Sequence, residues 1–266
     1  MEIDKINNNI QSKIIRLYVK LKLNKYKVNM KYLGYLDWKN WDEEKFGIIL
    51  PGNQFHFDQI FKGKIKKESK ILEIGFGNGE LLEYFTKLGH SVTGVEINDT
   101  LVQRGIKFGY ECYFGIAWKI PELKNQKYDL IVALAVAEHV DFEELNYFFL
   151  WAKNHLNENG TLHLKFPEGA SPLGLGYQNG DFTHVSCLTK TKIDALCKLT
   201  NMKIIKYSDE PLVSNNLCSL GLSGRLILYI LQLYSTVLKI IIKIILFPLC
   251  PSLKLSTNSI VVISSK

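Results

Sequence analysis

A glycine-rich turn constrains the fold of this chain more than any other stretch. Residues 71–79 read I-L-E-I-G-F-G-N-G. Apolar residues precede three glycines at every second position, and an amphipathic run begins at Leu81, which predicts a short buried strand, a tight turn and a helix. Glycine lets the backbone bend sharply and lets a ligand approach it with no Cβ in the way. The N-terminus of the helix adds free N–H groups that suit an anionic ligand group.

The spacing of these glycines separates two classes of nucleotide-binding turn. A dinucleotide fold has the pattern G-x-G-x-x-G. Counted from Gly75 and Gly77, its third glycine would fall at position 80, which is Glu80. A carboxylate there would repel a pyrophosphate, so the turn is a poor site for NAD. The pattern is instead an acid, Glu73, followed by one spacer and G-x-G-x-G.

A second acid stands where a nucleotide-binding fold holds a ribose. The segment His90–Ile97 has an alternating strand pattern and reaches Glu96, 21 positions after Gly75. A carboxylate at the tip of the second strand can accept hydrogen bonds from both ribose hydroxyls. We therefore predict that Glu96 binds the cofactor.

The motif E-I-G-F-G-N-G resembles motif I of the class I S-adenosylmethionine-dependent methyltransferases, and the resemblance covers about residues 68–208 and the final strand. It implies S-adenosylmethionine as cofactor and S-adenosylhomocysteine as product. The implied fold is α/β, a Rossmann-like doubly wound seven-stranded sheet of order 3-2-1-4-5-7-6 with the last strand antiparallel. In that family the acid at Glu73 holds the amino group of the methionine moiety. The expected cofactor contacts are Glu73, Gly75, Phe76, Gly77, Gly79, Glu96, Ile97, Ala117 and Ala133.

Further segments fit this fold. Strands are predicted at 110–114, 128–134, 161–166, 202–207 and 260–263, and helices at 101–108, 141–156 and 189–200. Strands that alternate with helices indicate a mostly parallel sheet. The glycine-rich segment 168–184 is predicted to be an irregular substrate loop at the carboxyl end of a strand. The family often places an acid after the third strand, but this chain has Gly115–Trp118, so adenine is expected to rest on the backbone and on Ile116, Ala117 or Trp118.

Candidate bases follow the fourth and fifth strands. In methyl transfer from a sulfonium the enzyme mainly aligns the nucleophile and excludes water, and a hydroxyl nucleophile benefits from a base. His184 ranks first because it lies in the predicted substrate loop, and His139 ranks second, since an unperturbed pKa of about 6.5 suits histidine to this role. Asp181 and Glu168 are the remaining candidates. Either histidine could instead cap a helix or form the pocket wall.

A metal site is the alternative use of the same residues. Some methyltransferases that act on small-RNA 3′ ends or on quinones are similar here, with an acid, a Glu-His pair and a distant histidine that bind a divalent metal. Glu138, His139 and His184 would supply three ligands, but Ala135 stands at the position of the earlier acid. The prediction is therefore that no metal is bound, with this trio as the alternative set.

Charge and apolar residues gather toward the two ends of the chain. The net charge is +7; residues 1–36 carry eight Lys/Arg against two acids, and residues 211–266 carry five basic residues and no acid. No basic, aromatic-rich RNA-binding module is apparent, so no nucleic-acid partner is expected. Residues 226–250 are apolar and long enough to span a membrane. Lys239 and Lys243 would cost roughly 2.5–3.5 kcal/mol each at the centre of a membrane-spanning helix, and one crossing would leave the final strand on the wrong side.

The expected organisation has four parts: an N-terminal helical and cap segment (1–66), the methyltransferase core (67–210), an apolar helical insertion (211–256) and the last strand (257–266). Helical spacing of Ile10, Ile14, Leu17 and Leu21 predicts an N-terminal helix. The aromatic residues Trp38, Trp41 and Phe46 are expected either over the cofactor or in the core. The insertion is expected to lie on a bilayer, pack on the domain or pair two subunits. Five scattered cysteines and the absence of a signal peptide favour the cytoplasm.

The leading functional prediction is O-methylation of a sugar or nucleotide-linked precursor in bacterial surface (capsule or lipopolysaccharide) polysaccharide biosynthesis. It depends on the loop G-D-F-T-H-V and the apolar insertion, which resemble those of methyltransferases in such pathways. The alternative is a quinone or lipid methyltransferase that docks on the inner face of the membrane through residues 226–250. A cofactor-binding module without catalysis is the third hypothesis, and a homodimer is a possible assembly.

Overall fold

The computed structural model describes residues 35–39, 41–246, 248–250 and 253–265. The chain divides into two compact units, Met1–Asp42 and Glu43–Lys266. In the first unit the described residues form the short helix α2 (Tyr35–Trp38). The predicted helix with Ile10, Ile14, Leu17 and Leu21 lies outside the described residues.

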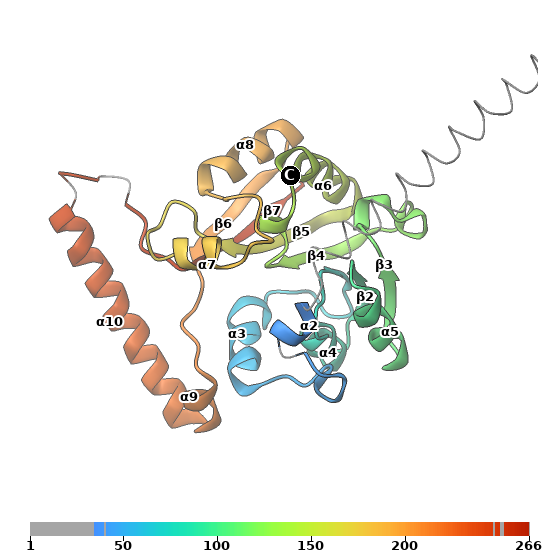
Figure 1. Ribbon diagram of the computed structural model, residues 1–266, viewed down its shortest axis with the longest axis horizontal. Coiled ribbons are helices and arrows are strands. Elements are labelled where there is room, and N and C mark those ends of the chain that lie inside the picture. The colour runs from blue at the N-terminus through green and yellow to red at the C-terminus, as the bar shows by residue number, and fades with distance from the viewer. Residues whose placement is uncertain (1–34, 40, 247, 251–252, 266) are drawn as a thin grey trace, which may run out of the picture. The chain divides into compact units, whose positions relative to one another are not determined.

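The second unit is built on a seven-stranded sheet of order β3-β2-β1-β4-β5-β7-β6 (Figure 1). The last strand in the chain, β7, runs antiparallel to both of its neighbours, and the other pairs are parallel. This confirms the predicted strand order and the antiparallel last strand. The strands are β1 (Lys70–Ile74), β2 (Ser91–Glu96), β3 (Glu111–Phe114), β4 (Tyr128–Leu134), β5 (Leu156–Pro167), β6 (Lys203–Asp209) and β7 (Asn258–Ser264).

Helices cover both faces of the sheet (Figure 1). Buried side chains of α3 and α4 form one core cluster with β1 and β4, and those of α6 and α8 form another with β4, β5 and β7. The central strand β4 is apolar at successive positions because both of its faces are covered. The helices are α3 (Pro51–Phe61), α4 (Glu80–Lys87), α5 (Asp99–Lys107), α6 (Phe142–His155), α7 (Leu175–Gly180), α8 (Lys190–Thr200), α9 (Asn215–Ser219) and α10 (Leu222–Leu246), with 3-10 turns η1 (Glu43–Lys45), η2 (Ala117–Lys119), η3 (Pro121–Leu123) and η4 (Ala137–His139).

Two predicted segments differ most from the structure. Strand β5 begins at Leu156 rather than at residue 161, because Leu156 already pairs with Tyr128 and a register shift then absorbs the polar residues that follow. Asn159 adopts a positive φ of 65° within that irregularity. The segment 168–184 is not irregular throughout, since it contains α7. The amide groups of Tyr177 and Gln178 donate to the Gly174 carbonyl and close this helical turn.

The insertion predicted before the last strand is helical. It contains α9 and the long helix α10. Among the described residues, α10 is the one helix that is long and apolar enough to span a membrane by length and composition.

Candidate active site

The glycine turn after β1 has the geometry that its sequence predicts. Gly75, Gly77 and Gly79 have φ values of 72°, 53° and 74°, a region that side chains with a Cβ rarely adopt. A Cβ on Gly79 would lie 2.6 Å from ring atoms of Phe46. Phe46 is buried and packs against Phe76 and Phe108. It therefore belongs to the aromatic core behind the turn.

Glu96 connects the turn to the end of β2. Its carboxylate accepts hydrogen bonds from the backbone amides of Gly77 at 3.2 Å, Ile97 at 2.7 Å and Asn98 at 3.1 Å. Burial raises the pKa of Glu96, and these three N–H groups lower it in part. A carboxylate has about four acceptor positions, so Glu96 can accept a further donor such as a ribose hydroxyl.

Glu73 is a buried acid with an unsatisfied oxygen. The residue is 6% exposed, and its Oε2 has no hydrogen-bond partner among the residues that the structure describes. Burial, followed by the charges of Glu96 and Glu80, raises its pKa well above the usual range. An acceptor left unpaired in the interior is costly. The position therefore fits a ligand that brings a positively charged donor, as the amino group of S-adenosylmethionine does.

The remaining predicted cofactor residues are placed differently. The side chain of Phe76 packs under β2, where a Cβ on Gly94 would lie 2.7 Å from its ring, so Phe76 can contribute only backbone atoms to a ligand. Ala117 and Ala133 are fully buried. The Trp118 indole donates to Glu144 at 2.6 Å and packs on Phe148.

Two histidines meet beyond the end of β4. His139 lies in η4, and its ring is 4.6 Å from that of His184 between centroids. Its Nδ1 is 2.8 Å from the Thr183 hydroxyl, which donates to Asp181 at 2.5 Å. Because that hydroxyl proton is directed to Asp181, Nδ1 of His139 is the donor in the first of these bonds. Nε2 is then the proton-accepting atom of the neutral His139 ring.

His184 lies between two carboxylates. Its Nδ1 donates to the Gln178 carbonyl at 3.1 Å, so Nε2 carries the lone pair in the neutral ring. Nε2 lies 3.7 Å from Asp181 and 3.9 Å from Glu138. Burial raises the pKa of Asp181, but the Thr183 hydrogen bonds and the two histidines outweigh it and leave this pKa below its usual value. Nε2 of His184 thus faces two carboxylates, one from the loop and one from the turn after β4.

The backbone of Glu138 holds the loop around His184 against the turn that follows β4. Its carbonyl accepts hydrogen bonds from the amides of Val185 and Ser186, each at 2.9 Å. The sequence did not indicate these bonds, nor the link made by Thr183. The structure thus brings together all three predicted residues of the catalytic set, His139, Asp181 and His184.

The alternative metal set also converges. One ligand atom from each of Glu138, His139 and His184 lies within 4.8 Å of the other two. Ligand atoms around a tetrahedral ion with bond lengths of about 2.1 Å are about 3.4 Å apart. The three atoms would therefore have to move closer together to hold a divalent cation, and a mixture of imidazole and carboxylate ligands suits several such ions.

Glu168, the remaining candidate base, occupies a different environment. It is 1% exposed and accepts hydrogen bonds from Tyr207 and Ser259, each at 2.6 Å. It joins the carboxyl end of β5 to β6 and β7. Its Oε2 holds the strands together and its Oε1 accepts the Ala170 amide at 3.1 Å, which favours a structural role.

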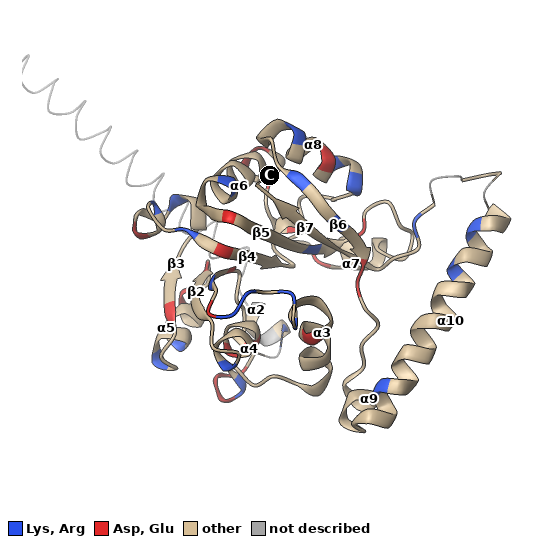
Figure 2. Cartoon of the chain, turned by 180° about the vertical axis from the view of Figure 1, so that it is seen from behind, with Lys and Arg blue, Asp and Glu red and all other residues tan. Residues whose placement is uncertain are grey.

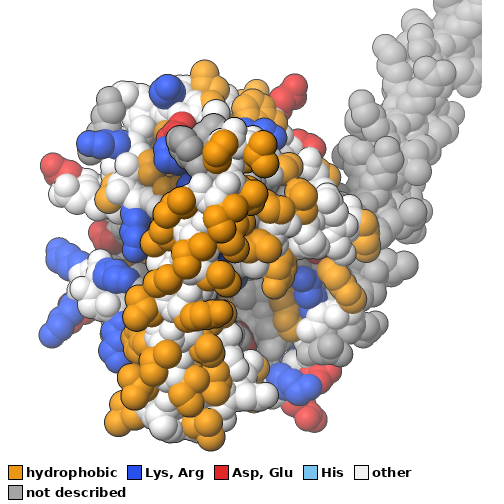
Figure 3. Space-filling view, turned by 90° about the vertical axis from the view of Figure 1, so that its left-hand side faces the viewer, with side chains coloured by type: hydrophobic (Ala, Val, Ile, Leu, Met, Phe, Trp, Pro, Cys, Tyr) orange, Lys and Arg blue, Asp and Glu red, His pale blue; other side chains and the backbone are white. Residues whose placement is uncertain are grey.

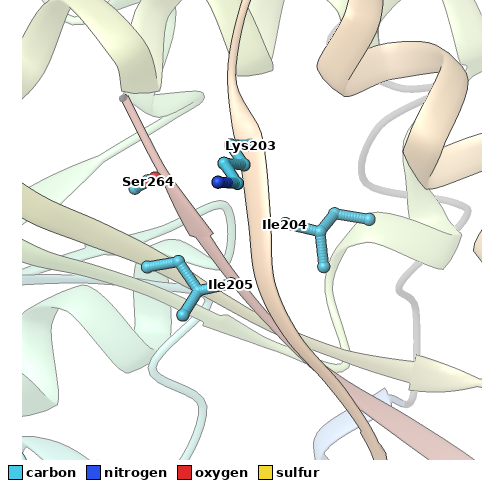
Figure 4. A pocket seen from close by; sticks show the side chains of 4 residues that line it. All are labelled: Lys203, Ile204, Ile205 and Ser264. Atoms are coloured by element: carbon cyan, nitrogen blue, oxygen red, sulfur yellow. The ribbon is translucent and has the colours of Figure 1, made fainter.

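A surface hollow at the far edge of the sheet is separate from this site. It is lined by Lys203, Ile204, Ile205 and Ser264 (Figure 4). Lys203 begins β6 and pairs with Ser264 at the end of β7. The hollow therefore lies at the amino end of β6, whereas the glycine turn and the histidines lie at the carboxyl ends of the parallel strands. It has no bearing on the chemistry of this site.

Known proteins resemble the chain over the same region. A family model described as a methyltransferase domain matches residues 56–207. The ubiquinone biosynthesis O-methyltransferase of Pelagibacter ubique (strain HTCC1062) is 28% identical over 102 residues, which is 37% of this chain and 42% of that protein. The ubiquinone biosynthesis O-methyltransferase of Nitrosococcus oceani is 26% identical over 111 residues, 38% of this chain and 46% of that protein. The chain thus matches less than half the length of these two relatives.

Solved structures share the fold. The crystal structure of a SAM dependent methyltransferase from Archaeoglobus fulgidus superposes with a TM-score of 0.55 at 17% identity, covering 87% of this chain and 99% of that one.

Proposed function

Since this chain belongs to the class I S-adenosylmethionine-dependent methyltransferase family, we propose that it methylates a hydroxyl oxygen of a lipid-soluble, quinone-type aromatic acceptor. The observation that carries this proposal is the convergence of His139, Asp181 and His184 beyond β4. A hydroxyl must lose its proton as it attacks, and these residues can accept and stabilise that proton.

The cofactor is assigned to the glycine turn and the two buried acids. S-adenosylmethionine supplies an electrophilic methyl group when it is bound. Glu73 would pair with its amino group, because Glu73 Oε2 is otherwise unsatisfied. Glu96 would accept from its ribose hydroxyls while the Gly77 amide keeps the carboxylate in place. The site residues can then align an acceptor with the methyl group and exclude water.

His184 is the proposed proton acceptor. The Gln178 carbonyl fixes its Nδ1–H, which leaves Nε2 to take the proton. Asp181 and Glu138 stabilise the resulting imidazolium from 3.7 and 3.9 Å. His139 is held by Thr183, which is in turn held by Asp181. Asp181 thus contacts both rings, that of His139 through Thr183 and that of His184 across 3.7 Å.

A divalent cation is the second use of this cluster. Held by Glu138, His139 and His184, it would supply Lewis acidity at the acceptor hydroxyl. The two mechanisms differ in one simple respect. A proton acceptor needs no metal, so only the metal mechanism loses activity when a chelator is added.

The acceptor class has two candidates. The curated relatives are named for ubiquinone biosynthesis, and neither name mentions a sugar. The sugar-linked acceptor predicted from the sequence depends on the resemblance of residues 180–185 and of the apolar insertion to those of polysaccharide methyltransferases. A quinone-type acceptor is favoured because α10, which follows β6, exposes apolar side chains. A cytoplasmic location, which the free cysteines favour, is part of the same proposal.

The test uses purified protein, methyl-labelled S-adenosylmethionine, a short-chain prenylated catechol and a set of nucleotide sugars. We expect label in the catechol ether. His184→Gln should lower kcat by roughly 10²–10⁴-fold while cofactor affinity stays within about twofold. His90→Gln, outside the cluster, should keep wild-type kcat. Transfer to a nucleotide sugar and not to the catechol would overturn the acceptor class, and unchanged kcat in His184→Gln would overturn the role of His184.

A further inference from the structure

Helix α10 exposes an apolar face along its whole length. Figure 3 shows hydrophobic side chains gathered over this helix, and six that share one face are 48% to 69% exposed. A single exposed apolar side chain is ordinary, but a continuous patch marks an interaction surface. The six are Leu226, Ile230, Leu233, Tyr234, Ile241 and Ile244.

The polar side chains of α10 form a separate stripe, in which Arg225, Gln232 and Lys239 are partly buried on the side of the domain while Thr236 and Lys243 are exposed. Arg225, Gln232, Thr236, Lys239 and Lys243 follow one another at intervals of seven, four, three and four residues, which places them on one side of a helix. Lys239 donates to Asp209 at 3.0 Å, and the Arg225 guanidinium lies 5.7 Å from the centre of the Phe55 ring. The apolar face is therefore turned outward, the reverse of a helix on the surface of a water-exposed domain.

Contacts with α3 hold the first half of α10 in place. Leu228 is buried beside Phe55 and Cys218. The Tyr229 hydroxyl accepts a hydrogen bond from Gln59 at 3.0 Å. The outward direction of the apolar face is thus fixed by packing at one end of the helix and by the Lys239 ion pair farther along.

The topology of the sheet excludes a single membrane crossing. The insertion leaves from Asp209 and returns at Asn258, and Asp209 pairs with Ser259 in adjacent strands, so both ends lie at the same edge. The helix has 25 residues, about 37 Å at ~1.5 Å per residue, which would cross a core of about 30 Å. A return crossing would fall to residues 247–257, whose two prolines interrupt the regular hydrogen bonding that lipid demands.

The same topology places both ends of the insertion at the end of the sheet that carries the candidate active site. Strands β5 and β6 are both antiparallel to β7, so they are parallel to each other. The insertion leaves from the carboxyl end of β6. This end therefore lies on the same side of the sheet as the carboxyl end of β4, which His139 follows. A surface bound by α10 would lie near the mouth of the site.

We propose that α10 lies flat in the interface of an anionic lipid bilayer, with its apolar face in the acyl region and the exposed Lys243 among the headgroups. Residues 211–265 contain Arg225, Lys239, Lys243 and Lys254 and no acid, and Figure 2 shows only basic residues coloured along α10. An amphipathic helix with such charges binds anionic membranes. A two-fold contact between copies would place this acid-free segment against itself. The inference rests on the proposed function in one respect: a lipid-soluble acceptor is the reason for the protein to bind a membrane.

The experiment is flotation of the full chain with vesicles of phosphatidylcholine alone or with phosphatidylglycerol added. The wild type should float with the anionic vesicles, at least tenfold more than with the neutral ones, and less at about 0.5 M salt. The pair Ile230→Glu and Ile244→Glu should reduce flotation at least tenfold. Leu199→Glu is the matched control, because Leu199 on α8 is 66% exposed but lies outside this face. Calorimetric binding of S-adenosylmethionine should be unchanged in all of them.

Several results would overturn the proposal. One is equal flotation of the wild type and the Ile230→Glu, Ile244→Glu variant. Another is that the wild-type protein does not float with either kind of vesicle. If that protein is also a dimer, and the two substitutions dissociate it, the apolar face of α10 would be assigned to contact with a second copy. Resistance to alkaline carbonate extraction would indicate a spanning helix instead. Flotation together with methyl transfer to a nucleotide sugar would leave the docking surface standing while the proposed acceptor fails.

Discussion

A Cβ on Gly75 would lie 2.5 Å from Cγ2 of Val136. This contact joins the glycine turn after β1 to the segment that follows β4. Ala135, directly before Val136, has a positive φ of 57°, which is uncommon for a residue with a Cβ. The close packing of the glycine turn therefore depends on the residues after β4 as well as on those after β1.

Replacement of Gly75 by alanine is predicted to cost more than strain alone. Gly63 has nearly the same φ, 70° against 72°, but a Cβ on Gly63 would meet nothing within 4 Å. Gly63→Ala should lose about 1–2 kcal/mol of unfolding free energy from strain, and Gly75→Ala should lose more and bind the cofactor more weakly. Adding Val136→Ala to Gly75→Ala should recover the difference. Equal losses in the two single variants, measured by urea unfolding, would contradict this account.

The sequence could predict the turn because each of its requirements is local. An acid, three alternating glycines and an acid at the end of the next strand are visible in the residues themselves. The whole of β4 was predicted for the same reason, since buried central strands are apolar at successive positions. Strand order followed from the family resemblance and not from the pattern of residues.

The histidine cluster needed the fold. His139 and His184 are far apart in sequence, and hydrogen bonds that only the folded chain makes, such as those from residues 185 and 186 to the Glu138 carbonyl, bring the loop to the end of β4. Thr183 was missed because a threonine in a loop gives no signal of what it will contact. The sequence also could not predict which face of α10 points outward. Periodicity shows which residues share a face but not which face meets the domain.

Removal of the Glu96 charge is predicted to weaken cofactor binding. Charge-assisted hydrogen bonds contribute about 1.5–3 kcal/mol each, so Glu96→Gln should reduce S-adenosylmethionine affinity by roughly 10–100-fold. Glu111→Gln on β3 is the control, because its partners are Thr93 and Tyr113. Titration calorimetry measures both, and equal affinity of Glu96→Gln and wild type would rule out the ribose assignment.

Cofactor binding is predicted to release a proton from Glu73. Its pKa is raised well above the usual range by burial and then by Glu96 and Glu80. Below that raised pKa the free protein holds a proton on Glu73, which must leave when a cationic amino group pairs with the carboxylate. Affinity should therefore fall as pH drops below that raised pKa. Binding heats should differ between buffers of different ionisation enthalpy in the wild type but not in Glu73→Gln. Buffer-independent heats in the wild type at acidic pH would refute the assignment.

Acid is predicted to destabilise the fold through His163. Burial, then the charges of Lys64 and Lys206, lowers its pKa to about 4, below the value of about 6.5 for an unfolded chain. The unfolded state therefore binds more protons, and stability present above pH 6.5 is lost as pH falls toward 4. Between pH 7 and 5 this amounts to roughly 2 kcal/mol. His163→Phe, which can still pack on Phe61, should lose about that much less over the interval in urea unfolding; an unchanged pH dependence would show that His163 does not contribute.

The acceptor is tested most directly by where the transferred methyl group goes in an extract of the source cells. Purified protein and methyl-labelled S-adenosylmethionine are added, and the products are partitioned between water and an organic solvent. We predict label in the organic phase, as an ether that survives mild alkali, and its loss when His184→Gln replaces the wild type. Label confined to a small anionic species in water would contradict a lipid-soluble acceptor and support the sugar-linked one.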